Sequence, residues 1–251
     1  MERTLKIPCG KEQFLTRMPK LDADDSFTFS CHPGIPCFNE CCADLNCALS
    51  PYDVVRLRDA LSLGSREFIE QFATVQLLAP IGFPEVLLKM SDDERKSCPF
   101  VRVEGCSVYG DRPTACRYYP LAKGTLRGRD GSFSERFALV RENHCRGFRE
   151  NKEYTPATWI SDQELEVYDT YFTEYHKLIT DLKAKGRTLN SNEFGITFLA
   201  LFRIDDFFTF LASQGLMQKL KLPESEINDI VSNEGTGLAF AMGWLRNFLL
   251  S

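Results

Sequence analysis

The sequence lacks an excess of positive charge, and it lacks an apolar run long enough to cross a membrane. Its 30 lysines and arginines are outnumbered by 35 aspartates and glutamates, which leaves a formal net charge of −5. Because nucleic-acid phosphates are bound by positive surfaces, this balance disfavours a nucleic-acid partner. The longest apolar stretch, residues 237–250, contains Arg246 and Asn247. A membrane-spanning helix needs roughly 20 apolar residues, so we expect no membrane span and interpret this stretch as a core helix.

Two motifs of well-known enzyme classes are also absent. No G-x-G-x-x-G loop follows a predicted strand, and the glycines at residues 124–131 are typical of hairpin turns. A conventional nucleotide or S-adenosylmethionine site is therefore not expected. The C-x3-C-x2-C motif of radical enzymes is broken because Asp44 stands where the third cysteine would be. Whether the chain is an enzyme stays open.

Histidine is scarce, with three residues in the whole chain. His176 falls in a predicted amphipathic helix, where we expect it to pack or to face solvent. His32 and His144 each adjoin a cysteine. We expect both to hydrogen-bond beside a metal site rather than to bind the metal themselves.

The first residues have no apolar segment of the kind found in a secretory signal. On that ground we expect a cytoplasmic protein, in a reducing compartment where disulfides are rare. Clustered thiols in that setting usually bind metal or take part in redox chemistry.

Cysteine is the residue that the sequence does supply, and eight of its ten cysteines fall into two groups. Thiolates bind zinc, copper(I) and iron–sulfur centres, and eight of them are enough for two four-coordinate sites. Scattered core thiols would not crowd into residues 31–47, and a disulfide framework is disfavoured in a reducing compartment. The grouping therefore predicts metal binding by the first 150 residues. The two groups are Cys31-x5-Cys37-x3-Cys41-Cys42 and Cys98-x7-Cys106-x9-Cys116 with Cys145.

The spacing within the first group bears on the kind of metal centre. Cys37 and Cys41 are four residues apart, so on a helical turn both point to one side and can share a metal. Cys42 must point elsewhere, because adjacent side chains diverge by about 100° on a helix and nearly 180° on a strand. The vicinal pair indicates either two neighbouring centres or one polynuclear centre. No C-x2-C knuckle of a zinc ribbon is present, which favours an iron–sulfur or multinuclear site and leaves zinc as the alternative.

Three arginines lie beside these cysteines in the sequence: Arg112, Arg117 and Arg146. Four thiolates on a zinc ion leave about two units of excess negative charge, which guanidinium groups could compensate. The alternative is that each is an ordinary surface arginine.

The rest of the pattern predicts an α+β protein. Ser50 and Pro51 are a typical helix start, followed by apolar residues at helical spacing up to Gly64. Strands are expected at residues 75–78, 86–90 and 137–141. Beyond residue 155 the apolar spacing predicts helices over residues 165–186 and 194–215, from 223, and over 238–250.

We therefore expect two parts. Residues 1–152 form an irregular, cysteine-rich domain with short helices and few strands, organised around metal. Residues 153–251 form an all-helical region packed on that domain. The junction, residues 151–160, lacks a flexible Gly/Ser run and carries Tyr154, Trp159 and Ile160, which favour burial.

Four segments give the chain a family resemblance. They are Phe29-Ser-Cys31-His-Pro-Gly-Ile-Pro-Cys37-Phe-Asn-Glu-Cys41-Cys42, Leu49-Ser-Pro-Tyr-Asp-Val, Cys98-Pro-Phe with Gly105-Cys106-Ser-Val-Tyr-Gly-Asp-Arg-Pro-x-x-Cys116-Arg, and His144-Cys145-x-Gly-Phe. Over residues 29–150 the chain resembles the YkgJ-type cysteine-cluster family, whose members are described as zinc- or iron-chelating and as containing iron–sulfur clusters. The family includes flagellin lysine methylases, but the resemblance implies a ligand set and not a reaction.

The resemblance implies that the metal ligands are the cysteines of the two groups: Cys31, Cys37, Cys41, Cys42, Cys98, Cys106, Cys116 and Cys145. Cys9 and Cys47 fall outside the pattern, and we expect them to be buried or free thiols.

Three functions fit these observations. The leading one is an intracellular protein that holds an iron–sulfur cluster, or zinc, for a redox or catalytic role. The second is an interaction protein in which zinc only stabilises the fold and the helical region binds a protein partner. The third is metal chelation or sensing. Chemistry at the metal needs an open or redox-active site, whereas a structural site is saturated and closed.

Overall fold

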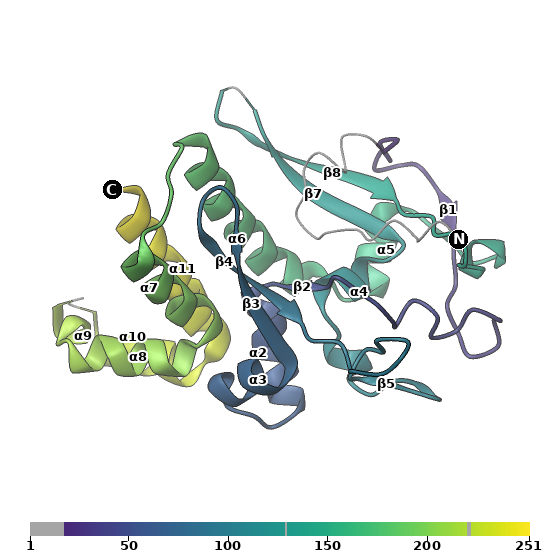
Figure 1. Cartoon of the computed structure of the whole chain (residues 1–251). Helices are drawn as coiled ribbons and strands as arrows, with labels where there is room; N and C mark the ends of the chain where they lie inside the picture. Colours follow the sequence, from purple (N-terminus) through teal and green to yellow (C-terminus); the bar gives the residue numbers. More distant parts are fainter. Residues whose placement is uncertain (1–17, 129, 220–221) are drawn as a thin grey trace. The chain divides into compact units, whose positions relative to one another are not determined.

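The structure is a computed structural model that describes residues 18–128, 130–219 and 222–251 (Figure 1). Cys9 lies outside these ranges. By its contacts the chain divides into two compact units. The cysteine unit contains the described residues up to Ala48 together with Leu87–Asp169, and the helical unit contains Leu49–Val86 and Thr170–Ser251.

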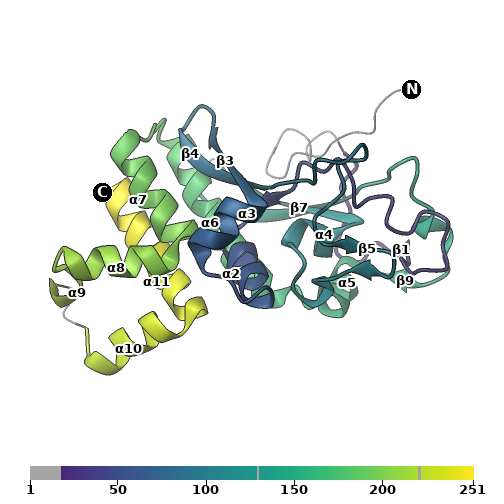
Figure 2. The same ribbon diagram turned by 60° about the horizontal axis from the view of Figure 1, so that its bottom comes forward.

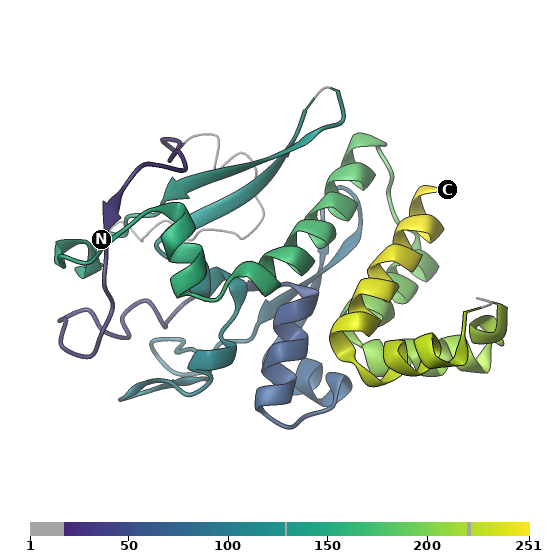
Figure 3. The same ribbon diagram turned by 180° about the vertical axis from the view of Figure 1, so that it is seen from behind.

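The cysteine unit is built from short antiparallel pairs rather than a broad sheet. The longest pair is the hairpin of β7 (Leu121–Arg127) and β8 (Phe133–Leu139), drawn in teal in Figure 1 and seen from behind in Figure 3. The other pairs are β1 (Phe27–Thr28) with β9 (Glu153–Tyr154), and β5 (Val101–Arg102) with β6 (Gly105–Cys106). Its helical turns are η1 (Tyr109–Asp111), α4 (Thr114–Tyr118), η2 (Gly147–Arg149) and α5 (Pro156–Asp162).

An aromatic cluster holds the two ends of the cysteine unit together. Trp159 of α5 contacts Tyr154 with ring centroids 4.8 Å apart, and it contacts Phe27 at 6.0 Å and Phe29 at 5.6 Å. Its indole Nε1 donates to the carbonyl oxygen of Tyr118 at 3.0 Å. Tyr154 and Trp159 are both buried, as the junction sequence predicts, and both are buried within this unit.

The helical unit combines an early segment with the C-terminal helices. The early segment holds α2 (Pro51–Ala60), α3 (Ser65–Phe72), β3 (Ala73–Leu78) and β4 (Phe83–Leu88), and β4 lies between β3 and β2 (Ala48–Leu49) in one sheet. After α6 (Glu166–Ala184), which begins in the cysteine unit, come α7 (Ser191–Phe202), α8 (Ile204–Ser213), α9 (Leu216–Lys219), α10 (Glu224–Ser232) and α11 (Glu234–Leu250).

The fold class predicted from the sequence is confirmed: the protein is α+β with a helical C-terminal region. The helix start at Ser50 is also confirmed, because the Ser50 hydroxyl accepts from the Asp53 backbone N–H and the Asp53 carboxylate accepts from Ser50. Two details differ. The first helix ends at Ala60, and Gly64 is the N-cap of α3 instead. The helix predicted over residues 194–215 is two helices, because Arg203 leaves helical geometry with φ −135° and ψ 57°.

The expected strands are present with shifted ends, and one strand was missed. β3 and β4 cover the first two, and β8 begins earlier than the strand predicted at residues 137–141. β7 was missed because Gly124 lies in its middle, and an isolated glycine argues against a strand. The hairpin turn expected near Gly131 is present, and Gly131 has φ +85°. Within the described ranges, no helix has both the length and the apolar character that crossing a membrane requires.

Residues far apart in the sequence share the core of the helical unit. α2 contacts α7 and α11 (Figure 2). Arg58 of α2 is buried and donates to both carboxylate oxygens of Asp205 at 2.8 and 2.9 Å, and it also pairs with Glu234. Asp205 further accepts from the backbone N–H and the hydroxyl of Ser65. The C-terminal helices therefore depend on residues 49–86. The boundary predicted at residue 152, and the packing of residues 153–251 on the cysteine domain, stay predictions.

The Arg58–Asp205 pair gives a test of this dependence. Asp205→Ala should lower the free energy of unfolding by about 2 kcal/mol, because it removes several hydrogen bonds, two of them from a buried guanidinium. Urea unfolding followed by circular dichroism measures the change. Asp206→Ala is the matched control: that neighbouring carboxylate pairs with Arg66, which is exposed, and with Arg203, so its loss should cost less than about 1 kcal/mol. Equal losses for the two variants would show that the buried pair does not join the segments.

Candidate metal centre

All eight cysteines of the predicted ligand set lie in the cysteine unit. Seven are in loops or short strands, and Cys116 is on α4. All eight have half-buried or exposed positions, whereas Cys47 is 5% exposed and belongs to the core. The predicted ligands are therefore reachable from solvent, and the buried position of Cys47 agrees with its expected packing role.

Backbone contacts bring Cys31, Cys37 and Cys145 into one region. The β1–β9 pair is extended by hydrogen bonds from Phe29 N to the Lys152 oxygen at 2.9 Å and from Ser30 N to the Gly147 oxygen at 3.1 Å. The Arg146 backbone N–H then donates to the Cys37 sulfur at 3.1 Å.

Only glycine fits at position 147. A Cβ atom built there would lie 2.6 Å from the Phe29 ring and 2.7 Å from the Ser30 oxygen. The close approach of the two segments that carry Cys31 and Cys145 therefore depends on this glycine.

A second set of contacts joins Cys42, Cys98 and Cys106. Cys98 N donates to the Cys42 oxygen at 2.9 Å, beside a bridge between Ala43 and Ser97. From Cys98 the chain runs directly into the β5–β6 hairpin, in which Cys106 faces Val101.

The thiols also act on one another electrostatically. Although Cys31 is exposed at the surface, partial shielding of its thiol from water raises its pKa to about 11, and the charges of Cys41, Cys37 and Cys145 raise it further. Burial likewise raises the pKa of Cys98 to about 11, with Cys116 and Cys106 contributing.

Cys41 connects the two neighbourhoods. Its sulfur lies 3.9 Å from that of Cys42, and the hydrogen bond between them is the main reason why its pKa is raised, followed by burial. The charges of Cys42 and Cys116 raise this pKa as well. Cys41 therefore lies within electrostatic reach of members of both sets.

The donor set fits a soft transition metal. A thiol with a raised pKa stays protonated at neutral pH, and a metal ion releases the proton and offsets the repulsion between neighbouring thiolates. Within the described part of the chain, no three His, Cys, Asp or Glu side chains are already arranged around one position for an ion. The sulfur atoms would have to move closer together around a metal or cluster.

Two buried arginines supply positive charge beside the cysteines. Arg112 is 8% exposed and Arg117 is 3% exposed. Arg112 donates to Tyr109 O at 2.6 Å and to Gln163, and its guanidinium lies 3.9 Å from the centre of the Tyr109 ring. Burial lowers the pKa of Arg112, and the charges of Cys116 and Cys106 oppose that effect.

Arg117 is held in a similar way. It donates to the carbonyl oxygens of Gln163, at 2.7 Å, and Gly110, and it lies over the Tyr168 ring. Among the described residues neither Arg112 nor Arg117 pairs with a carboxylate. The third predicted arginine, Arg146, is exposed and reaches the Cys37 sulfur through its backbone N–H.

The two histidines beside the cysteines each lie near a carboxylate, and their expected role beside a metal stays a prediction. His32 Nε2 lies 3.2 Å from a Glu150 carboxylate oxygen, and its Nδ1 accepts from Gly34 N at 3.1 Å. His144 Nε2 lies 3.4 Å from a Glu142 oxygen. Burial raises the pKa of Glu142, and His144 opposes that rise.

Tyr119 is a candidate residue that sequence reasoning missed. Its hydroxyl is buried and has no hydrogen-bond partner at bonding distance among the described residues. Burial raises the pKa of Cys145, and Tyr119 opposes that rise. The only sequence signal for a role of Tyr119 at the site was its position three residues after Cys116. That signal is weak, because tyrosine is often buried in protein cores for packing alone.

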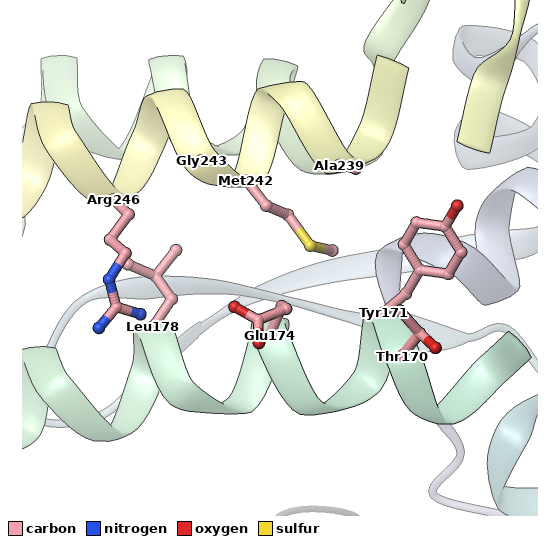
Figure 4. Close-up of a pocket in the computed structure, with 8 residues that line it drawn as sticks. All are labelled: Thr170, Tyr171, Glu174, Leu178, Ala239, Met242, Gly243 and Arg246. Atoms are coloured by element: carbon pink, nitrogen blue, oxygen red, sulfur yellow. The ribbon is translucent and has the colours of Figure 1, made fainter. Parts of the chain in front are cut away.

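A pocket elsewhere in the chain offers no thiol or imidazole. It lies between α6 and α11 in the helical unit and measures about 140 Å³ (Figure 4). Met242 and Leu178 contribute to its largely apolar lining, and the ion pair of Arg246 with Asp181 at 2.6 Å lies beside it. It is therefore not a candidate for the metal.

The fold and the thiols define a class: a cysteine-rich α+β protein suited to binding a soft metal. Residues 30–154 match the model of the CxxCxxCC family, described as "Putative zinc- or iron-chelating domain". This domain of the chain belongs to that family, and the match confirms the resemblance seen in the sequence. The matched residues include all eight predicted ligands. The family label ends in a vicinal pair, as does the first group here at Cys41 and Cys42, although the spacing before that pair is wider in this chain. No curated protein and no solved structure matches the chain.

The buried arginines provide a test of charge compensation. Arg117→Gln should lower bound metal and reduce the free energy of unfolding of the metal-loaded protein by about 3 kcal/mol, because it removes a buried charge and its hydrogen bonds. Metal analysis and urea unfolding measure the two effects. Arg66→Gln is the control and should keep the wild-type metal content, since Arg66 is an exposed arginine of the helical unit. If Arg117→Gln keeps full metal, its guanidinium is not the counter-charge of the centre.

Proposed function

We propose that this protein is a cytoplasmic metalloprotein that holds an iron–sulfur cluster, with zinc as the alternative, on Cys31, Cys37, Cys41, Cys42, Cys98, Cys106, Cys116 and Cys145. The observation that carries the proposal is that eight cysteines from four separate stretches of chain lie in one unit, within a domain of a family described as chelating zinc or iron. When bound, an iron–sulfur cluster supplies electron transfer or a reactive iron, whereas zinc supplies structure or Lewis acidity.

The exposure of two ligands favours a centre with a chemical role. Cys31 and Cys116 are exposed, so an electron donor or a small molecule can approach the sulfurs. A purely structural zinc site is usually closed by its four ligands. We therefore place redox or catalytic use first and metal chelation or sensing after it.

A second candidate is an interaction protein in which zinc stabilises the fold. The helical unit exposes the apolar side chains of Val231 and Phe248, by 54% and 41%, and a bound partner would cover them. Under this alternative the metal would be colourless and inert to reduction.

Replacement of single cysteines tests the ligand set. Each of the eight changed to serine should lower bound metal, because a hydroxyl is a poor ligand for a soft metal, and should weaken the cysteine unit, because metal binding is coupled to folding. Metal content per chain and limited proteolysis measure the effects. Cys47→Ala and Cys9→Ala are the controls and should keep the wild-type metal content. Full occupancy in several of the eight serine variants would overturn the assignment.

The identity of the metal is tested on protein purified without oxygen. The vicinal pair and the absence of a C-x2-C knuckle favour a cluster, so the protein should be brown and contain acid-labile sulfide as well as iron. A visible absorption spectrum with iron, zinc and sulfide analysis decides between the alternatives. Colourless protein with stoichiometric zinc and no sulfide would reject the cluster and support the structural alternative.

A further inference from the structure

The segment of residues 156–169 belongs to the cysteine unit, although it lies beyond the end of the matched family domain. It contains α5 and the first turn of α6. This segment holds α4, the helix that carries Cys116. Trp159 Nε1 donates to the Tyr118 carbonyl oxygen at 3.0 Å, and the Tyr118 hydroxyl donates to Asp169. The position of one predicted ligand therefore depends on residues that the family match does not include.

Gln163 connects this segment to both buried arginines. It is the C-cap residue of α5 and is half-buried. Its side-chain oxygen accepts from the Arg112 guanidinium, and its backbone oxygen accepts from Arg117 at 2.7 Å. Its Nε2 donates to the Asp162 carboxylate at 2.7 Å, which orients the side-chain amide. One uncharged residue therefore holds two cationic side chains.

The acceptors of these arginines fix their positions and leave their charge uncancelled. A carboxylate is the stronger partner for a guanidinium, yet the other acceptors are the carbonyl oxygens of Tyr109 and Gly110. The Nε of Arg117 is buried and has no hydrogen-bond partner among the described residues. The positive charge of both side chains is therefore available to a negative group nearby.

The predicted metal ligands are the nearest candidates for that negative group. Arg117 directly follows Cys116 on α4, and Arg112 lies between η1 and α4, in the loop from Cys106 to Cys116. Four protonated thiols that bind a zinc ion become a centre with about two units of negative charge. Positive charge held beside the thiols lowers the cost of that change.

We propose that Gln163 is a positioning residue of the metal centre. Its two neutral oxygens hold Arg112 and Arg117 beside the cysteines, so that the charge of the guanidinium groups offsets that of metal-bound thiolates. This inference rests on the proposed function, that the cysteines bind metal. It adds a residue outside the family domain on which metal binding depends, and it adds a reason why that residue is an amide and not an acid.

Gln163→Glu separates positioning from a structural role. The carboxylate keeps an acceptor for Arg112 but cancels its charge, so the variant should bind Co2+ about tenfold more weakly than wild type. A structural role alone predicts Co2+ binding that is unchanged or tighter, because a carboxylate bonds a guanidinium more strongly than an amide does. Metal-free protein is titrated with Co2+ against a chelator of known affinity, without oxygen, and the thiolate-to-cobalt absorption reports binding.

Two further variants complete the experiment. Gln163→Met removes the side-chain acceptor and adds no charge, so it should weaken Co2+ binding less than Gln163→Glu does. A structural role predicts the reverse order, because only the methionine variant leaves the guanidinium without its acceptor. Gln214→Glu is the matched control and should bind Co2+ as wild type does: Gln214 is the C-cap residue of α8, exposed and in the helical unit.

Several results would overturn the proposal. Wild-type affinity in Gln163→Glu, or an equal loss in Gln214→Glu, would show that charge at residue 163 does not act on the centre. Wild-type affinity in Gln163→Met would do the same, whether or not Gln163→Glu folds. Each of these results leaves metal binding itself intact. Wild-type protein that contains no metal as purified and does not bind Co2+ would instead reject the proposed function, so the two failures are distinguishable.

Discussion

Burial of thiols close to one another is the constraint on which the cysteine unit depends. Loss of contact with water raises the pKa of Cys31 and of Cys98 most, and the charges of neighbouring cysteines raise each further. Eight such groups can ionise together only beside a cation. In a unit whose strands are mostly two residues long, cross-links through metal would supply order that a broad sheet supplies elsewhere, and metal binding and folding would be one process.

The protein supplies part of the compensating charge through buried groups. Arg112 and Arg117 are almost fully buried, and their hydrogen bonds go to neutral oxygens of Tyr109, Gln163 and Gly110. Burying a guanidinium without a carboxylate is costly. The negative charge of metal-bound thiolates would offset this cost, in the way that a paired carboxylate does in other proteins. The arginines and the cysteines then form one electrostatic group.

Local signals in the sequence were enough for the chemistry and for most elements. The cysteine grouping, the Ser50 cap and the period of α6 depend on nearby residues, and each was predicted from them. The strand through Gly124 depends on its pairing with β8, and the effect of Tyr119 on Cys145 depends on a fold that brings the two residues together. Spacing in the sequence reveals neither. The same holds for the pairing of Arg58 with Asp205, which joins segments separated by more than half of the chain.

The order of the two units along the chain has a consequence for chain entropy. The chain leaves the cysteine unit after Cys42, contributes residues 49–86 to the helical unit, and returns to the cysteine unit before Cys98. A metal shared by these two cysteines would close a loop of roughly 55 residues, and the chain-entropy relation for such a cross-link corresponds to about 4 kcal/mol. The helical unit contains none of the eight cysteines. Its first segment, residues 49–86, would nevertheless lie inside the closed loop, so its unfolded chain would have fewer conformations to lose on folding. Metal binding by the cysteine unit would in this way also favour the folding of residues 49–86.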